Sequence, residues 1–333
     1  MMLMRKSANY LRIFVALIAF ILAFHVDIPQ PAAEKKHIET GAMIYPGQRD
    51  LSGDIDYIKD LFDHPGFSPS SLSNSPATTE EAKVNKYTFK VRKKEDDGKV
   101  CMDIFRSGKK VRSDCSDSIG HLAVIVEPAP GTDINGDEVP EVIVDNYTGG
   151  AHCCSAYAIF SLGKNLKLID LLYGEHSYFN FKDLDGDGKY EAIGRDWIFA
   201  YWNTSFAGSP SPEVILRWKN GKYRLAADLM KKPPPAKKEL LKITAKLKKN
   251  AELDEEKPEK LQWTPEWWAV MVKLIYTGNG NLAWEFYDWT WPAPKDKSSR
   301  KESLKEKRLF LNEFKKQLKK SYYWADLKKM NGW

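Results

Sequence analysis

Short segments rich in hydrophobic residues follow one another between residues 86 and 229, and most of them end at turn-forming residues. A hydrophobic period of two, visible in YTFKV and YFNF, is typical of β-strands. The segments are YTFKV, VCMDIF, HLAVIV, EVIVDNY, AYAIFSL, LKLIDLLY, YFNF, YEAIGRD, EVILRW and KYRLAA. The pattern predicts a mainly β domain over residues 86–230, built as a β-sandwich or a partial propeller.

Beyond residue 262 the hydrophobic spacing becomes that of amphipathic helices. The first helix is expected between Thr264, a good N-cap, and Gly278, and two more at about 282–289 and 299–320. The residues expected to face inward are Trp267, Met271, Leu274, Ile275, Leu282, Phe286, Trp289, Leu304, Leu311, Phe314 and Leu318. We therefore predict a small α-helical C-terminal region over residues 263–333.

Two segments between these parts are predicted to be linkers. Residues 34–85 include the stretch SPSSLSNSPATTEEA, which is poor in hydrophobic residues and predicts a largely irregular linker. Residues 231–262 begin with KKPPPAKK, which predicts a proline- and lysine-rich linker followed by a helix.

The N-terminal segment, residues 1–33, has the pattern of an export signal. A basic stretch precedes IFVALIAFILAF, an apolar run at residues 13–24. A run of this length fits the core of a signal peptide and is short of the roughly 20 residues that a membrane span needs. We expect an extracytoplasmic protein of the periplasm, cell envelope or exterior, and the alternative is an uncleaved inner-membrane anchor.

The stretch FKDLDGDGKYEAI places four acids in a short turn. Asp183, Asp185, Asp187 and Glu191 occupy positions 1, 3, 5 and 9 of a loop. Together with the Lys189 carbonyl, their oxygens can converge on one hard cation, and oxygen ligands in this number are what Ca²⁺ prefers. An EF-hand would need a glutamate at position 12, where this chain has a glycine. A solvated acidic turn is the alternative interpretation.

A second copy of this loop lies 50 residues earlier in the chain, counting from residue 133 to residue 183. Its predicted ligands are Asp133, Asn135, Asp137, the Val139 carbonyl and Glu141. Since Asn135 supplies a neutral oxygen, this copy is expected to be the weaker site. The regular spacing of the two loops, 133–141 and 183–191, indicates a structural repeat.

The two loops and the strands around them resemble the calcium loops of FG-GAP/VCBS-type repeat proteins, relatives of the blades of integrin α-chain propellers. The resemblance covers residues 122–218 and implies a β fold that binds Ca²⁺. The succession of TGGAHCC, the second loop and SPSPEVILRWKNGKYRL also resembles uncharacterised bacterial exported proteins. That resemblance implies location and fold and no activity.

The chain has four cysteines, and export would permit disulfides. A hairpin turning at Gly108 would place Cys101 opposite Cys115, although pairings with Cys153 or Cys154 remain open. The stretch containing His152, Cys153 and Cys154 is interpreted as structural, and a thiol enzyme or hydrolase using these residues is the alternative.

The C-terminal part is basic and rich in tryptophan. Residues 231–333 hold 24 Lys and Arg and 14 Asp and Glu, a net charge of +10 (24 − 14), and the whole chain carries +6. The tryptophans placed near element ends, Trp291, Trp324 and Trp333, are the candidates for a lectin-like glycan-binding surface.

The sequence contains no G-x-S-x-G, H-E-x-x-H or P-loop motif, so we expect no catalysis. We predict an exported calcium-binding module with a structural or binding role at the bacterial cell envelope. Its partner would be an unknown protein, a glycan or an envelope polymer, with membrane association through the N-terminal segment as a further option. Nucleic acid is not expected as a partner, because no nucleic-acid-binding fold is recognised.

Overall fold

The computed structural model describes residues 75–93, 99–116, 121–150, 153–252, 264–294 and 296–333. All of them belong to one compact unit, Asp50–Trp333. The predicted signal peptide or anchor and most of the predicted linker at 34–85 lie outside the described residues. None of the helices in the described part has the length and apolar character needed to cross a membrane.

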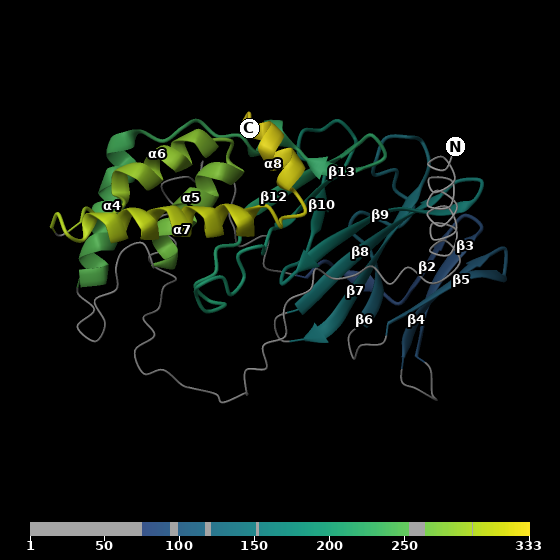
Figure 1. Cartoon of the computed structure of the whole chain (residues 1–333). Helices are drawn as coiled ribbons and strands as arrows, with labels where there is room; N and C mark the ends of the chain where they lie inside the picture. Colours follow the sequence, from purple (N-terminus) through teal and green to yellow (C-terminus); the bar gives the residue numbers. More distant parts are fainter. Residues whose placement is uncertain (1–74, 94–98, 117–120, 151–152, 253–263, 295) are drawn as a thin grey trace, which may run out of the picture. The chain divides into compact units, whose positions relative to one another are not determined.

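The strands of the described residues form three antiparallel sheets (Figure 1). The orders are β2-β3-β4-β5, β1-β6-β7-β8-β9 and β10-β11-β12-β13. The strands are β1 (Thr78–Thr79), β2 (Glu81–Val84), β3 (Tyr87–Lys93), β4 (Val100–Arg106), β5 (Lys109–Ser116), β6 (His121–Ile125), β7 (Glu141–Gly150), β8 (Cys153–Leu162), β9 (Leu166–Glu175), β10 (Asn180–Lys182), β11 (Glu191–Arg195), β12 (Glu213–Lys219) and β13 (Lys222–Leu225).

The three sheets repeat one simple topology. Each contains four strands that are consecutive in the chain and pair with their sequence neighbours, and β1 adds a short fifth strand beside β6. Consecutive four-stranded meanders are also the building unit of propeller blades. In the second and third meanders, the connection between the first two strands is one of the predicted acidic loops.

Successive residues of a strand point to opposite faces of its sheet, and in the middle sheet both sets include hydrophobic residues that are buried. Val142, Val144 and Phe160 belong to the core shared with the sheet β2–β5. Ile143 and Ile159, their neighbours in sequence, belong to a second core shared with the sheet β10–β13 and the helices. The middle sheet is therefore packed between the other two.

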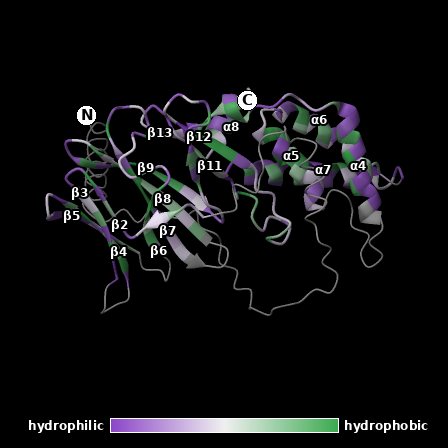
Figure 2. Ribbon diagram, turned by 180° about the vertical axis from the view of Figure 1, so that it is seen from behind, coloured by the Kyte–Doolittle hydropathy of each residue, from purple (hydrophilic) through white to green (hydrophobic). Residues whose placement is uncertain are grey.

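The helices complete the second core. They are α3 (Ala227–Met230), α4 (Lys237–Glu252), α5 (Pro265–Tyr276), α6 (Gly280–Thr290), α7 (Arg300–Leu318) and α8 (Trp324–Met330). Helix α5 is hydrophobic and most of its residues are buried, whereas α4 and α7 carry hydrophilic residues beside hydrophobic ones (Figure 2). The core runs without interruption from strand residues such as Leu216 to helix residues such as Trp268 and Phe314.

Polar contacts also join the helices to the sheets. The fully buried carboxylate of Asp196, just after β11, accepts hydrogen bonds from the hydroxyls of Tyr276 on α5 and Ser321 near α8. At the start of the predicted linker, the Lys232 amide donates to the Thr277 carbonyl at 3.1 Å. The proline-rich segment is thus held against the end of α5.

The fold class predicted from sequence is confirmed: a mainly β part precedes a small α-helical C-terminal region. Two details were wrong. Strands β1 and β2 lie inside the predicted linker 34–85, because Ala82 and Val84 alternate with exposed charges over a segment too short to stand out. Leu304, expected to face inward, is 51% exposed, and Phe310 takes the inner position on α7.

Candidate metal centre

The first acidic loop, Asp133–Glu141, is organised around the carboxylate of Asp133. Its Oδ1 accepts the backbone amides of Gly136 at 2.7 Å and Asp137 at 3.2 Å, and its Oδ2 accepts that of Glu138 at 2.8 Å. At the other end, Oε2 of Glu141 accepts the Ile134 amide at 3.1 Å. The loop is therefore closed by its own acids, which turn toward the backbone amides inside it.

The second acidic loop, Asp183–Glu191, repeats this arrangement. Asp183 Oδ1 accepts the amide of Gly186 at 2.7 Å, and Oδ2 accepts that of Gly188 at 3.0 Å. Oε2 of Glu191 accepts the Leu184 amide at 3.0 Å. The two loops therefore share one internal hydrogen-bond pattern as well as one sequence pattern.

The two acidic loops lie side by side. The amide of Tyr190 in the second loop donates to the Ile134 carbonyl in the first at 2.9 Å. Gly136 has φ +77°, and a Cβ atom there would lie 2.6 Å from Cε of Lys189. The positive φ favours glycine at this position, and the missing side chain leaves room for the close approach of the lysine.

In each acidic loop, three carboxylates lie close enough to share a cation. Oxygens of Asp133, Asp137 and Glu141 lie within 4.8 Å of one another, and so do those of Asp183, Asp185 and Glu191. Six of the predicted side-chain ligands are thus brought together. The remaining two behave differently.

Asn135 is buried, and its Oδ1 accepts the Asp137 amide at 2.9 Å. Asp187 forms an ion pair with Nζ of Lys189 at 3.3 Å. The main-chain carbonyls of Val139 and Lys189 stay predicted ligands. The Val139 and Lys189 amides donate to Oδ1 of the acid two residues earlier in the chain, at 2.9 and 2.8 Å.

Glu141 is the most unusual acid of the set. It is 2% exposed, and within the described structure no donor lies in normal hydrogen-bond geometry with its Oε1. Burial raises its pKa to about 7, and the negative charges of Asp137 and Asp133 reinforce this shift; the Ile134 amide and, more weakly, the nearby Ser161 side chain oppose it. A buried carboxylate oxygen left without a donor is costly unless a cation reaches it.

The second acidic loop has a cation of its own that the sequence analysis missed. Arg217 on β12 pairs through Nε with Glu191 at 2.7 Å, through Nη1 with Asp228 at 2.9 Å, and through Nη2 with Asp185. These ion pairs raise the pKa of the guanidinium above its usual range, and the pair with Glu191 has the largest effect. Because Arg217 lies 26 residues after Glu191, no local spacing in the sequence could reveal the contact.

A buried acid outside the acidic loops was also missed. Asp145 on β7 is 1% exposed, and its Oδ2 lies 3.2 Å from Nε2 of His121 on β6. Burial raises the pKa of Asp145 to about 6, and the interaction with His121 opposes the shift. The register that pairs His121 with Tyr147 brings these strands together, which sequence spacing alone cannot show.

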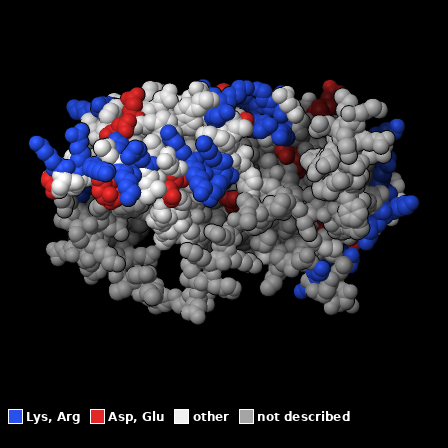
Figure 3. All heavy atoms as spheres, viewed as in Figure 1, with Lys and Arg blue, Asp and Glu red and all other residues white. Residues whose placement is uncertain are grey.

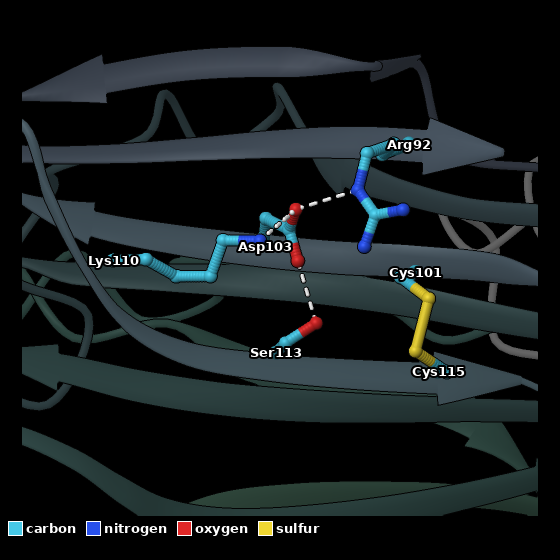
Figure 4. Close-up of a disulfide and its surroundings, with 6 residues drawn as sticks. All are labelled: Arg92, Cys101, Asp103, Lys110, Ser113 and Cys115. Carbon is cyan, nitrogen blue, oxygen red and sulfur yellow. Dashed lines mark hydrogen bonds and ion pairs between the residues drawn. A yellow bond between two sulfur atoms is a disulfide. The ribbon is translucent and has the colours of Figure 1, made fainter. Parts of the chain in front are cut away.

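The predicted cross-strand disulfide is confirmed. Cys101 on β4 and Cys115 on β5 are register partners and are bonded, with the hairpin turning at Ser107 and Gly108 (Figure 4). Two positions along β4, the carboxylate of Asp103 accepts hydrogen bonds from Arg92, Lys110 and Ser113 (Figure 4). Burial opposes ionisation of Asp103, but these donors outweigh it and hold its pKa well below the usual range.

The alternative thiol site receives less support. Cys154 takes part in a disulfide, and none of the cysteines that the structure describes is free. His152, the proposed base, lies outside the described residues. A thiol enzyme or hydrolase at this segment would need a cysteine thiolate as nucleophile, which a disulfide-bonded sulfur does not provide.

The tryptophans do not form an open platform in the part of the chain described here. Trp291, Trp324 and Trp333 are partly buried against the helical core. The exposed large hydrophobic side chains among the described residues are valines, leucines and tyrosines. A lectin-like surface would need flat, exposed rings, so the tryptophans are better explained by packing.

Basic side chains, in contrast, gather over α7 (Figure 3, seen from the same side as Figure 1). Those on its exposed face are Lys301, Lys305, Arg308, Lys316 and Lys319. Their spacing places them along one side of the helix, opposite Phe310 and Phe314.

No protein-family model matches the chain, and no solved structure matches it. A probable thylakoid lumen protein of Synechocystis sp. (strain ATCC 27184 / PCC 6803 / Kazusa) is 35% identical to it over 96 residues. The match covers 27% of this chain and 28% of that protein, so the chain spans little more than a quarter of the relative's length. The chain is thus similar in part to a protein described as lumenal.

Proposed function

We propose that this protein is an extracytoplasmic calcium-binding module with a structural or binding role, in which Ca²⁺ stabilises the junction between two β-sheets. The ligands would be the carboxylates of the two acidic loops. The first loop leads into β7 of the middle sheet, and the second leads into β11 of the neighbouring sheet. A cation held there would strengthen the contact between the loops, which includes the backbone hydrogen bond from Tyr190 to Ile134.

The observation that carries the proposal is the orphaned oxygen of Glu141. Among the described residues, no lysine or arginine forms an ion pair with Asp133, Asp137 or Glu141, although their oxygens lie within 4.8 Å of one another. Three carboxylates at that spacing repel one another in a partly buried place. Ca²⁺ takes six to eight oxygen ligands at about 2.3–2.6 Å, so it would satisfy all three acids at once.

Further features support an extracytoplasmic location. A disulfide joins Cys101 to Cys115, and such bonds persist in oxidising compartments. The partially similar protein is described as lumenal, and the apolar run at residues 13–24 fits an export signal. Free calcium is also more plentiful outside the cytosol, where weak sites fill.

The resemblance to FG-GAP/VCBS-type repeats stays part of the proposal. It is supported by the position of both acidic loops, each between the first and second strands of a four-stranded meander. The basic face of α7 would give the module an anionic partner, either an acidic protein or an envelope polymer, through electrostatic attraction.

Isothermal titration calorimetry of the purified protein with CaCl₂ tests the proposal. Asp137→Asn keeps the acceptor for the Val139 amide and removes one ligand charge. We expect it to weaken the first site at least about tenfold, equivalent to about 1.4 kcal/mol.

Glu138→Gln is the matched control. Glu138 lies in the same loop and is exposed, but its side chain is not among the clustered acids. Its replacement by glutamine removes one negative charge, as Asp137→Asn does. Its isotherm should equal that of the wild type. If the wild type takes up no Ca²⁺, or if both variants weaken binding equally, the proposed ligand set is wrong.

A further inference from the structure

We propose that Arg217 acts as a built-in counter-cation of the second acidic loop, so that Ca²⁺ must displace it there, and that the first acidic loop is the stronger calcium site. The inference rests on the proposed function and deepens it. It reverses the order that ligand charge alone predicts, because four of the predicted ligands in the second loop are acids and only three in the first.

The guanidinium of Arg217 uses the carboxylates that the second loop would offer to a metal. Two of its three partners, Glu191 and Asp185, belong to the group of acids that lie within 4.8 Å of one another. The third, Asp228 on α3, holds the guanidinium from the other side at 2.9 Å. Glu191 is fully buried, and Arg217 satisfies its Oε1.

At the first loop, Glu141 occupies the same position as Glu191 and is buried to nearly the same extent. Its Oε2 makes the same bond to the loop backbone, but no cation among the described residues reaches its Oε1. The two loops therefore share one pattern of backbone hydrogen bonds, but among the described residues only the second has its clustered acids paired with an arginine.

This difference sets the order of affinity. A divalent cation entering the first loop gains the full attraction of three acids and relieves their mutual repulsion. A cation entering the second loop must first break charge-assisted hydrogen bonds to Arg217, which are among the stronger polar contacts in proteins. The released arginine would keep only its bond to Asp228, so filling the second site would also loosen the link between that loop and β12.

The test compares calcium titrations of the full chain and two variants by calorimetry. Arg217→Gln removes the competing charge and should raise the affinity of the second site at least about tenfold. Asp228→Asn leaves all loop acids in place and removes only the exposed anchor of the arginine. It should lower the affinity of the second site about two- to fivefold, because the displaced arginine then loses the partner that it would keep, and it provides the readout if Arg217→Gln does not fold.

Arg224→Gln is the matched control, because Arg224 is the cross-strand neighbour of Arg217 and pairs with Asp326 instead of a loop acid. Its isotherm should be unchanged. The second site is identified by its loss in Asp185→Asn, and the first by its loss in Asp137→Asn.

The inference and the proposed function fail in different ways. If the wild type binds Ca²⁺ at the first loop but Arg217→Gln shows no gain at the second and Asp228→Asn leaves the second site unchanged, the counter-cation role is wrong and the calcium proposal stands. If the wild type binds nothing while Arg217→Gln gains a site, the proposed role of the first loop is wrong and the inference about Arg217 stands. If two sites of equal affinity appear in the wild type, the inferred order is overturned.

Discussion

Replacing Glu141 by glutamine should stabilise the protein in the absence of Ca²⁺ and destabilise it, relative to the wild type, when Ca²⁺ is in excess. The side chain is 2% exposed, Oε2 accepts the Ile134 amide, and within the described residues Oε1 has no partner. Glutamine keeps an acceptor for that amide, removes the buried negative charge, and offers an NH₂ group toward Asp133 and Asp137. In chelator, Glu141→Gln is therefore expected to be more stable than the wild type.

The magnitude follows from the cost of an unsatisfied buried polar group, about 1–3 kcal/mol and more where the group is charged. For a chain of this size, 1 kcal/mol shifts the melting temperature by about 2–4 °C. We therefore expect a rise of roughly 2–12 °C in chelator. With excess Ca²⁺ the order should invert, because the wild type gains the binding free energy and the variant has lost one charged ligand.

Thermal unfolding followed by circular dichroism, in chelator and in excess Ca²⁺, measures both differences. Glu138→Gln makes the same charge change on an exposed side chain of the same loop and should leave both melting temperatures close to those of the wild type. If Glu141→Gln is less stable than the wild type in both buffers, the carboxylate is a structural hydrogen-bond acceptor and the reasoning about its orphaned oxygen is refuted.

Three other predictions concern stability. Reducing the Cys101–Cys115 bond, with its sequence separation of 14, should cost about 3 kcal/mol in urea unfolding, and no change on reduction would contradict a stabilising role for this bond. Burial and the charge of Asp196 raise the pKa of Glu175 from 4.5 to about 7, so the native state keeps a proton that the unfolded chain loses. Glu175 alone should thus lower the free energy of unfolding by about 3 kcal/mol as pH rises through that range, and Glu175→Gln should reduce the difference between urea titrations at pH 5 and 8 by that amount. Because the pKa of Asp103 is depressed in the folded state, its ionised carboxylate stabilises the protein above the unfolded pKa, and this stabilisation is lost in acid. Asp103→Asn should therefore destabilise the protein by about 1–2 kcal/mol at pH 7 and have less effect near pH 2.

Much of the fold could be predicted because its signals are local. Strands such as β7 and β12 follow from short hydrophobic runs, and helix α5 follows from its stripe between Thr264 and Gly278. The acidic loops could also be predicted from local sequence, since all the proposed ligands of one site lie within nine residues. The hairpin around Gly108 placed Cys101 opposite Cys115 for the same reason.

The parts that could not be predicted depend on contacts between distant segments. Arg217 reaches Glu191 only because β12 pairs with β11, and it looks like an ordinary polar residue of a strand in the sequence. Leu304 fits the hydrophobic spacing of α7, but the helix is oriented so that Phe310 packs against Trp267 and Tyr287 while Leu304 is exposed. The order of affinity that we propose for the two loops likewise depends on a cation supplied from outside either loop.

The most direct test of the central claim is the melting temperature of the wild-type protein as a function of free Ca²⁺. If calcium is part of the fold, stability should rise with concentration as mass action requires, by about 2.7 kcal/mol at a hundred times the dissociation constant, or roughly 5–10 °C. A melting temperature that is the same in chelator and at every calcium concentration would contradict the account and leave the acidic loops as ordinary solvated turns.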